Sequence, residues 1–356
     1  MTKQHILARL LLLLLLPVLL MAPIGCKKGS DAPLSSGLSM IQGEPVYDKD
    51  VAMRTDHFTV TPGMMAFFFY DYGGVLISEM EKHVTYDKTK SLHDQIYDDG
   101  LSWYDVLMNA TLERVCEMLI YCEAAQSEGV TLTEAHKSAI EQDISGMRFD
   151  AAAGYSISLD EYLQALYGPL ANETALRAVR ELELLAATYS ATLTKRLEQG
   201  ITTDAAKAYA AANGLNDNTP SRNIAYLAIP YVGGKADDGK VSEVLSALQK
   251  SKNADTFNGF SAYGTVGAEQ NLTPDNTGLA EISDWLFATE RTLGDHGRVE
   301  IGSYTYVILY TANGYSYGEV EARMRLYDVA FADWYNGWVE ALHFGYNYDI
   351  IDSYDI

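Results

Sequence analysis

The most regular hydrophobic pattern in the chain runs from Leu101 to Gly129. Its apolar positions recur at steps of three and four residues, which places them on one face of a helix. They are Leu101, Tyr104, Met108, Leu112, Val115, Leu119 and Cys122. Ser102 is placed as the N-cap, with Asp105 three residues later, and Gly129 supplies a C-terminal stop. The pattern therefore predicts a helix of about 25 residues, ~37 Å long.

Helix signals also flank this segment on both sides. Thr61-Pro62 starts an aromatic-rich helix, which is expected to end or break at Gly73-Gly74. The aromatic stretch 64–72 is either a buried helix face or a surface for unfolded clients. Later helices are expected to start at capping signals, namely Thr131, Ser158, Asn172 and Thr203. The region 51–217 is therefore predicted to be a helical domain.

The pattern changes at residues 218–220. Segment 222–231 is strand-like, 240–252 is helical, and 253–278 is rich in Gly, Asn and Thr and is expected to be a loop. A short helix at 283–290 and strands at 299–301 and 304–311 follow. This order predicts a small α+β domain over 218–313.

The last segment, 314–356, returns to helix. Ser316 and Glu319 form a capping-box pattern, and a wide apolar stripe follows. The stripe consists of Val320, Met324, Tyr327, Phe331, Trp334, Trp338 and Leu342. Because an exposed stripe of this size would aggregate, it is expected to pack on the helical region. The predicted fold is thus mainly α with an inserted small α+β domain, and the tail 346–355 is expected to be a solvated loop.

The N-terminus reads as a secretory signal over residues 1–25, with a charged start and a short apolar run. Pro23-Ile24-Gly25-Cys26 resembles the lipobox of bacterial lipoproteins, which implies that Cys26 is lipidated. Residues 26–50 would then form a flexible tether. The expected location is extracytoplasmic, with a lipid anchor in the cell membrane. The lack of a disulfide pattern favours a Gram-positive surface.

Composition, charge and the absence of known sequence motifs argue against several other classes of protein function. The chain carries 26 basic and 48 acidic residues, a formal net charge of −22, which argues against nucleic-acid binding. Cys116 and Cys122 lie ~9 Å apart on one helix, too far for a disulfide. No nucleotide, metal or hydrolase motif is present, so no cofactor is expected.

The order of these segments resembles the SurA and PrsA type of extracytoplasmic foldase. That family combines a SurA/trigger-factor-like helical chaperone domain, completed by a returning C-terminal helix, with an inserted parvulin-like (FKBP-like) domain. The most specific likeness is Ile282–Phe287 (ISDWLF), followed by Gly294-Asp295 and a tyrosine-rich closing strand. The stretch 122–130 is similar to the end of the family's long helix.

The resemblance also marks where the chain departs from the family's isomerase site. Parvulins carry two core histidines, and the matching positions here are Asn223 and Tyr306, which are expected to lie near each other. The loop 258–278 has no cysteine, and Asp275 lacks the following glycine pair. The apolar residues matched to the substrate pocket are Phe287, Trp285 and Phe257. The resemblance thus implies an isomerase fold whose catalytic histidines are replaced.

The implied function is a membrane-anchored chaperone or foldase with weak or absent peptidyl-prolyl isomerase activity, acting on unfolded or partly folded secreted polypeptides. Client binding is expected in the helical domain. An active isomerase remains an alternative, because lowering the ~18–20 kcal/mol barrier needs little covalent chemistry. A solute-binding lipoprotein of a transporter is the other alternative, and it would require two α/β lobes.

Overall fold

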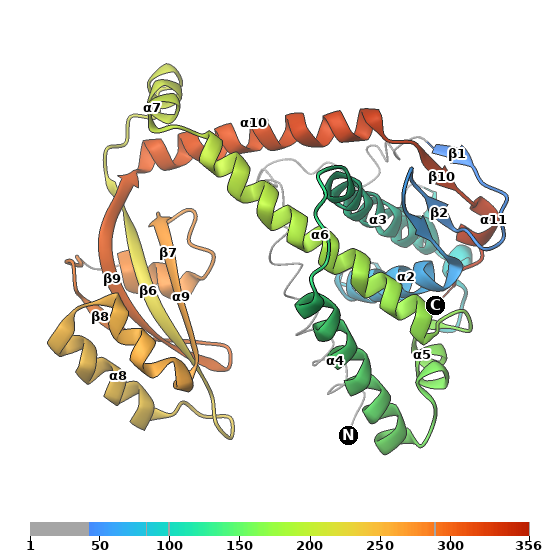
Figure 1. Ribbon diagram of the computed structural model, residues 1–356, viewed down its shortest axis with the longest axis horizontal. Coiled ribbons are helices and arrows are strands. Elements are labelled where there is room, and N and C mark those ends of the chain that lie inside the picture. The colour runs from blue at the N-terminus through green and yellow to red at the C-terminus, as the bar shows by residue number, and fades with distance from the viewer. Residues whose placement is uncertain (1–42, 83, 99, 288–289, 356) are drawn as a thin grey trace. The chain divides into compact units, whose positions relative to one another are not determined.

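The computed structural model describes residues 43–82, 84–98, 100–287 and 290–355, which form two compact units (Figure 1). Unit 1 comprises the described residues up to Leu197 and again from Ala330; unit 2 comprises Glu198–Val329. The helices α6 (Glu173–Gly200) and α10 (Tyr317–Ala341) each contribute to both units. Among the described helices, none has the length and apolarity needed to span a membrane. The predicted signal and Cys26 lie outside the described residues.

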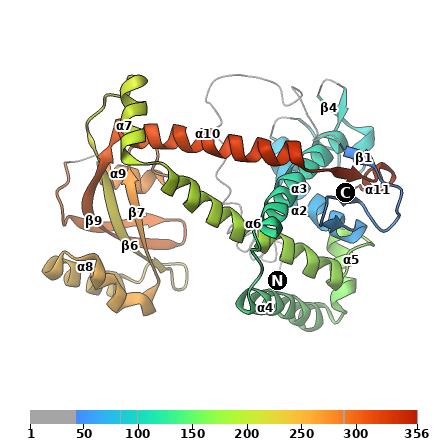
Figure 2. The same cartoon turned by 45° about the horizontal axis from the view of Figure 1, so that its top comes forward.

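Unit 1 is built around α3 (Trp103–Ser127), the predicted long helix. Ser102 and Asp105 form the expected capping box, in which each side chain bonds the other's backbone N–H. The predicted apolar face is buried from Tyr104 to Cys122, and residues 118–125 are buried all round the helix. The helix therefore forms the centre of the core, with α2 (Pro62–Met80) packed beside it (Figure 2).

The helix α2 does not break at Gly73-Gly74, as was expected, but continues to Met80. Its aromatic residues Phe67, Phe68 and Phe69 are each at most 1% exposed. Burial of these side chains outweighs the ~1 kcal/mol that each helical glycine costs. The aromatic stretch is therefore core rather than an exposed client surface.

Three further helices complete the helical part of unit 1: α4 (Glu134–Asp150), α5 (Leu159–Tyr167) and α6. Ser158 and Asn172 cap α5 and α6 as predicted. The cap of α4 is Thr133 rather than Thr131, because His136 completes a capping box there. A one-turn π-helix, η2 (Ala151–Tyr155), follows α4.

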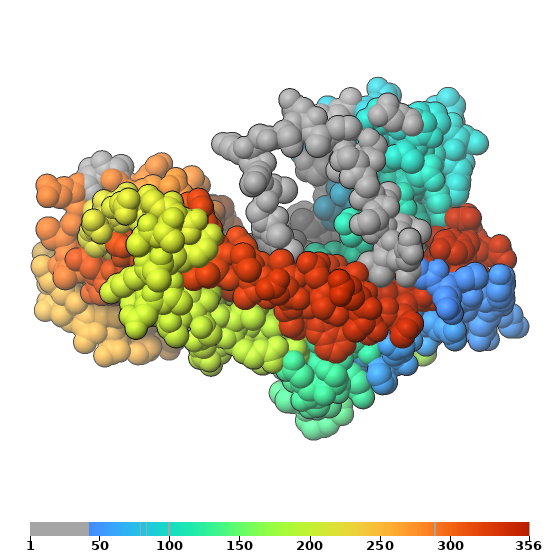
Figure 3. All heavy atoms as spheres, turned by 90° about the horizontal axis from the view of Figure 1, so that it is seen from above, coloured from blue at the N-terminus to red at the C-terminus, as the bar shows by residue number. Residues whose placement is uncertain are grey.

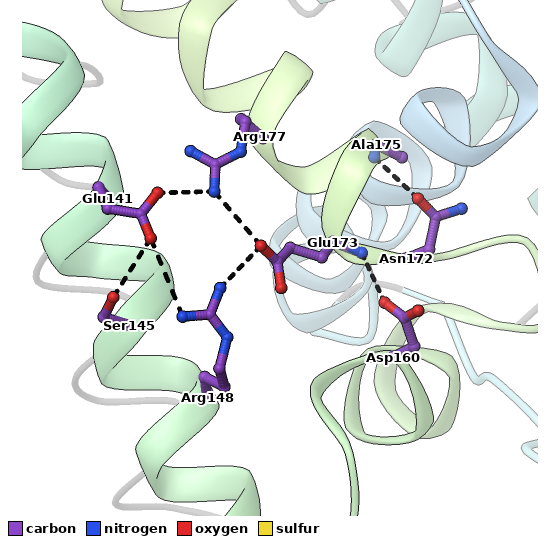
Figure 4. A network of polar contacts seen from close by, with 8 residues as sticks. All are labelled: Glu141, Ser145, Arg148, Asp160, Asn172, Glu173, Ala175 and Arg177. Atoms are coloured by element: carbon purple, nitrogen blue, oxygen red, sulfur yellow. Dashed lines mark hydrogen bonds and ion pairs between the residues drawn. The ribbon is translucent and has the colours of Figure 1, made fainter.

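A network of half-exposed charges joins these three helices (Figure 4). Arg177 on α6 contacts Glu141 on α4 at 2.7 Å, and Arg148 on α4 contacts Glu173 on α6 at 2.8 Å. The carboxylate of Asp160 on α5 accepts the backbone N–H of Glu173 at 2.7 Å. Because exposed ion pairs contribute little stability, the network mainly fixes the register of the helices.

The C-terminal segment belongs to unit 1 only from Ala330 onward, and the first half of α10, where Met324 of the expected packing stripe is 52% exposed, belongs to unit 2. The strand β10 (Phe344–Tyr346) lies between β1 (Gly43–Pro45) and β2 (Met53–Arg54), and β3 (Thr59–Val60) completes the sheet. Trp334 packs against Tyr121 with ring centroids 5.4 Å apart. The tail is not a solvated loop, because Tyr346, α11 (Tyr348–Ile351) and Tyr354 lie against the helical core. The small elements η1 (Leu92–Asp94), β4 (Ile96–Asp98) and β5 (Leu101–Ser102) precede α3.

Unit 2 contains one four-stranded antiparallel sheet of order β7-β6-β9-β8. Its strands are β6 (Pro220–Pro230), β7 (Thr265–Leu272), β8 (His296–Ile301) and β9 (Tyr304–Ser316). The accompanying helices are α7 (Thr203–Ala212), α8 (Asp238–Ser251), η3 (Ala254–Tyr263) and α9 (Ala280–Phe287). The segment 253–278 is thus not a loop, since η3 and the edge strand β7 lie within it. The cap of α7 is Thr202 rather than Thr203.

The two faces of this sheet carry different helices. Leu227 and Val307 point to a core formed with α8 and η3, whereas Ile224 and Ile308 point to a core formed with α9. We call these the α8 face and the α9 face. Alternate residues of a strand face opposite sides, so the face of a strand residue follows from its register wherever no register shift intervenes.

The two ends of the sheet domain lie side by side. The carbonyl of Thr219 accepts the N–H of Tyr317 at 2.9 Å, and Arg323 on α10 donates to Ile201 O at 2.9 Å and to Thr203 Oγ1 at 3.0 Å. In the space-filling view of Figure 3 the atoms of α7 adjoin the first turns of α10. The domain is therefore an insertion with adjacent entry and exit points.

Candidate functional site

The α9 face of unit 2 is only partly covered by its helix. Its buried centre is surrounded by half-buried aromatic side chains, namely Tyr226, Tyr306, Trp285 and Phe287. The rings of Tyr226 and Tyr306 pack together with centroids 5.4 Å apart. At the outer end of the same face Tyr304 is 37% exposed. The result is an open aromatic surface supported by a rigid sheet, which is the candidate functional site.

Two glycines on the edge strands allow this arrangement. A Cβ on Gly267 of β7 would lie 2.4 Å from Cζ of Tyr226, so the tyrosine ring lies directly over the glycine. A Cβ on Gly297 of β8 would lie 2.5 Å from Nε1 of Trp285. Since ordinary carbon contacts are ~3.5–4.0 Å, any larger residue would displace either ring. The glycines therefore fix the two outer aromatic side chains of the site.

Arginine side chains hold the aromatic residues of α9. The Arg222 guanidinium lies 5.1 Å from the Phe287 ring centroid and 5.4 Å from that of Tyr310, and it donates to the carbonyl of Leu286. Arg291 lies 4.4 Å from the Trp285 ring centroid and donates to the Trp285 carbonyl at 2.8 Å. Both cations are therefore engaged in positioning the C-terminal end of α9.

The tyrosine pair cannot exchange protons near neutral pH. Burial, followed by the negative charge of Glu269, raises the pKa of Tyr226 above its ordinary value of 10.0. Burial also raises the pKa of Tyr306, with smaller contributions from Tyr304 and Glu269. Both hydroxyls remain neutral and can donate and accept hydrogen bonds. The pair thus offers aromatic surface and neutral hydroxyls, and it lacks the proton exchange at pH 5–8 that a pair of histidines provides.

Three of the predicted site residues come together on this face. Phe287, Trp285 and Tyr306 all pack against the core of the α9 face. Phe257 does not, because it is fully buried on the α8 face among residues of α8. It is a core residue, and the sheet separates it from the other three.

Asn223 does not lie beside Tyr306, contrary to the expectation. In the antiparallel register Asn223 pairs with Ala312, whereas Tyr306 pairs with Ala228. Asn223 Oδ1 instead accepts the backbone N–H of Asn271 at 2.7 Å, next to register shifts in β6. Its role is to satisfy the backbone of Asn271, which has a left-handed φ of 57°.

The residue that does lie beside Tyr306 is Tyr226, three positions further along β6. The sequence contained a weak signal for it, since Tyr226 alternates with Ile224 in an apolar run. The sequence gives no signal for Glu269, because the Gly-, Asn- and Thr-rich composition of 253–278 is typical of a loop. Its position on the α9 face follows from its pairing with Ile224.

Histidine and metal chemistry find no support on this face. His296 is the one histidine of 198–329, and it pairs with Leu309, whose side chain points to the α8 face. Within the described parts of the chain, no group of three or more His, Cys, Asp or Glu side chains is arranged to hold a metal ion.

Comparison with known proteins gives structural neighbours only. No family model matches the chain, and no curated protein sequence matches it. It is similar to PrsA from Bacillus subtilis (15% identity, 72% of this chain and 90% of that chain, TM-score 0.29). It is also similar to foldase protein PrsA from Streptococcus pneumoniae (13% identity, covering 65% of this chain and 79% of that chain, TM-score 0.25). A third similar structure belongs to the SurA-like chaperones of Campylobacter jejuni (10% identity, covering 83% of this chain and 98% of that chain, TM-score 0.22). These are the PrsA and SurA types of protein that the sequence resembles, and at these TM-scores the likeness alone establishes no function.

Proposed function

We propose that this chain is an extracytoplasmic foldase-type chaperone whose sheet domain binds extended segments of unfolded secreted polypeptides, with weak or absent isomerase activity. In this proposal the helical unit is the SurA/trigger-factor-like part, and the insert is the parvulin-like part. Lipidation of Cys26, as implied by its lipobox-like setting, would anchor the protein to the membrane.

The observation that carries the proposal is the half-buried Tyr226–Tyr306 pair on the α9 face, against whose core Phe287 also packs. Tyrosine and phenylalanine rings provide large apolar contact area at little cost in side-chain entropy. A proline ring or an apolar client side chain can pack on such a surface without any titrating group. This differs from the expectation that clients bind the helical domain, because the aromatic stretch of α2 on which that expectation rested is buried.

Two features argue for binding rather than fast isomerisation. The tyrosine pair stays neutral at physiological pH, and the histidine of unit 2 lies on the opposite face of the sheet. The transporter alternative is disfavoured, because unit 1 is mainly helical and the strands described in it are only two or three residues long.

Suppression of client aggregation tests the proposal. The mature chain is expected to slow the aggregation of reduced, denatured lysozyme, and the Tyr226→Ala/Tyr306→Ala double variant should lose most of this effect. The matched control is Tyr263→Ala, which removes a tyrosine from the α8 face. The proposal fails if the double variant protects the client as well as the control does.

A further inference from the structure

The open aromatic face contains a carboxylate that the proposed function does not use. Glu269 lies on β7 and pairs with Ile224, so its side chain points to the α9 face. Gly267, two residues earlier on the same face, is covered by the Tyr226 ring. Glu269 therefore lies diagonally next to Tyr226, within reach of its hydroxyl end.

This carboxylate has no partner in the described chain. Neither a hydrogen bond nor an ion pair joins it to another described residue, and burial alone raises its pKa above the usual range. Tyr226 and Tyr306 both sense its charge. Arg222, on the same face of β6, is already held by Phe287, Tyr310 and the Leu286 carbonyl. A half-buried, unpaired carboxylate is costly unless a bound group compensates it.

We propose that Glu269, Tyr226 and Tyr306 form a subsite for a cationic side chain, so that the α9 face prefers client segments carrying lysine or arginine. This inference rests on the proposed function, because it specifies which clients the aromatic face selects. A cation placed over a tyrosine face gains from the ring quadrupole, and the carboxylate beside it adds a charge-assisted hydrogen bond. The aliphatic stem of the same side chain packs on the aromatic surface.

Charge complementarity favours a cationic occupant. Both tyrosines of the subsite are neutral. Its charged member is therefore Glu269, whose negative charge acts on both tyrosines. The protein as a whole carries a net charge of −22, which attracts basic polypeptides from solution. This long-range attraction is not specific to the subsite, so the test requires a variant that removes an equal charge elsewhere.

The test measures fluorescence anisotropy of two labelled heptapeptides with the full mature chain. One is Ala-Lys-Ala-Pro-Ala-Lys-Ala, and the other has norleucine at both lysine positions. The lysine peptide is expected to bind about tenfold more tightly. Glu269→Gln should remove most of that preference while leaving the affinity for the norleucine peptide unchanged. Asp255→Asn on η3 removes one charge near the α8 face and should preserve the preference.

The outcomes separate the two proposals. Equal binding of both peptides to the wild-type chain, or a preference that survives Glu269→Gln, overturns the cationic subsite and leaves the proposed function intact. Failure of both peptides to bind overturns both. A loss of preference in Asp255→Asn equal to that in Glu269→Gln shows that only net charge matters and also overturns the subsite.

Discussion

Replacing Gly267 by alanine tests the placement of Tyr226 over β7. The added Cβ would lie 2.4 Å from Cζ, 2.5 Å from Oη and 2.7 Å from Cε2 of Tyr226. The ring must move by about 1 Å to restore normal contacts. Overpacking of this kind costs ~1–3 kcal/mol, and removing a strand glycine returns ~0.5–1 kcal/mol. We therefore expect a net destabilisation of about 1–2 kcal/mol.

Hydrogen exchange of 220–230 and 265–272, followed by mass spectrometry, reports this loss locally. Exchange in both strands should become about 5–30-fold faster, because each 1.4 kcal/mol is a factor of ten. In a Tyr226→Ala background the clash is absent, so adding Gly267→Ala should be neutral or stabilising. The non-additivity of the two changes is the quantity to measure.

Gly259→Ala is the matched control for Gly267→Ala. Gly259 on η3 has open space at its Cβ position, so Gly259→Ala should not accelerate exchange. If Gly267→Ala costs the same with and without Tyr226, the ring does not lie over β7. The tyrosine pair and the subsite built on it would then be misplaced.

Three further predictions concern other parts of the chain. Burial raises the pKa of Asp71 from its ordinary 3.8 to about 7, so folding takes up a proton between these two pH values. The free energy of unfolding therefore falls as pH rises through this range. The decrease in melting temperature between pH 5 and pH 8 should be smaller in Asp71→Asn than in the wild-type chain. A chain joining Asn218 to Gly314 through a short Gly/Ser linker should keep the cooperative thermal unfolding of unit 1 but lose most client protection, because the ends of the insert are hydrogen-bonded neighbours. Full protection by this deletion would place the client surface in the helical unit. Palmitate labelling in a Gram-positive host should mark the wild-type chain and not Cys26→Ala, and equal labelling would refute lipidation.

The helices were predictable from the sequence where local signals and burial agree. The helix α3 has a capping box and a continuous apolar face, and both are present in the structure. The break expected at Gly73-Gly74 was wrong, because glycine propensity is weaker than the burial of the aromatic residues before it. The buried Glu123 on α3 was not anticipated either. Its side chain is 2% exposed, and the burial of its carboxylate is compensated by hydrogen bonds from the Thr55 hydroxyl and the His57 backbone N–H, which are far away in sequence.

The candidate site was predictable only in part. Phe287 and Trp285 follow from the family-like motif on α9, and both line the site. The strand β7 has no clear sequence signal, because it is an edge strand in which half of the residues are exposed and only Leu272 is buried, so it lacks an apolar alternation. The ring contact between Tyr306 and Tyr226 depends on the register of β6 and β9, which shifts at irregularities near Asn223. Register of this kind is set by long-range pairing and cannot be read from one strand.

Exchange NMR on an Ala-Pro peptide with the full mature chain distinguishes peptide binding from catalysed isomerisation. We predict that the peptide binds, with line broadening that Phe287→Ala reduces, while the cis–trans exchange rate stays close to that of the free peptide. The physical reason is that Tyr306, which lies where the resemblance places a catalytic histidine, and Tyr226 beside it stay neutral and exchange no proton near pH 7. A catalysed exchange rate comparable to that of an active parvulin, and abolished by Phe287→Ala, would contradict the account.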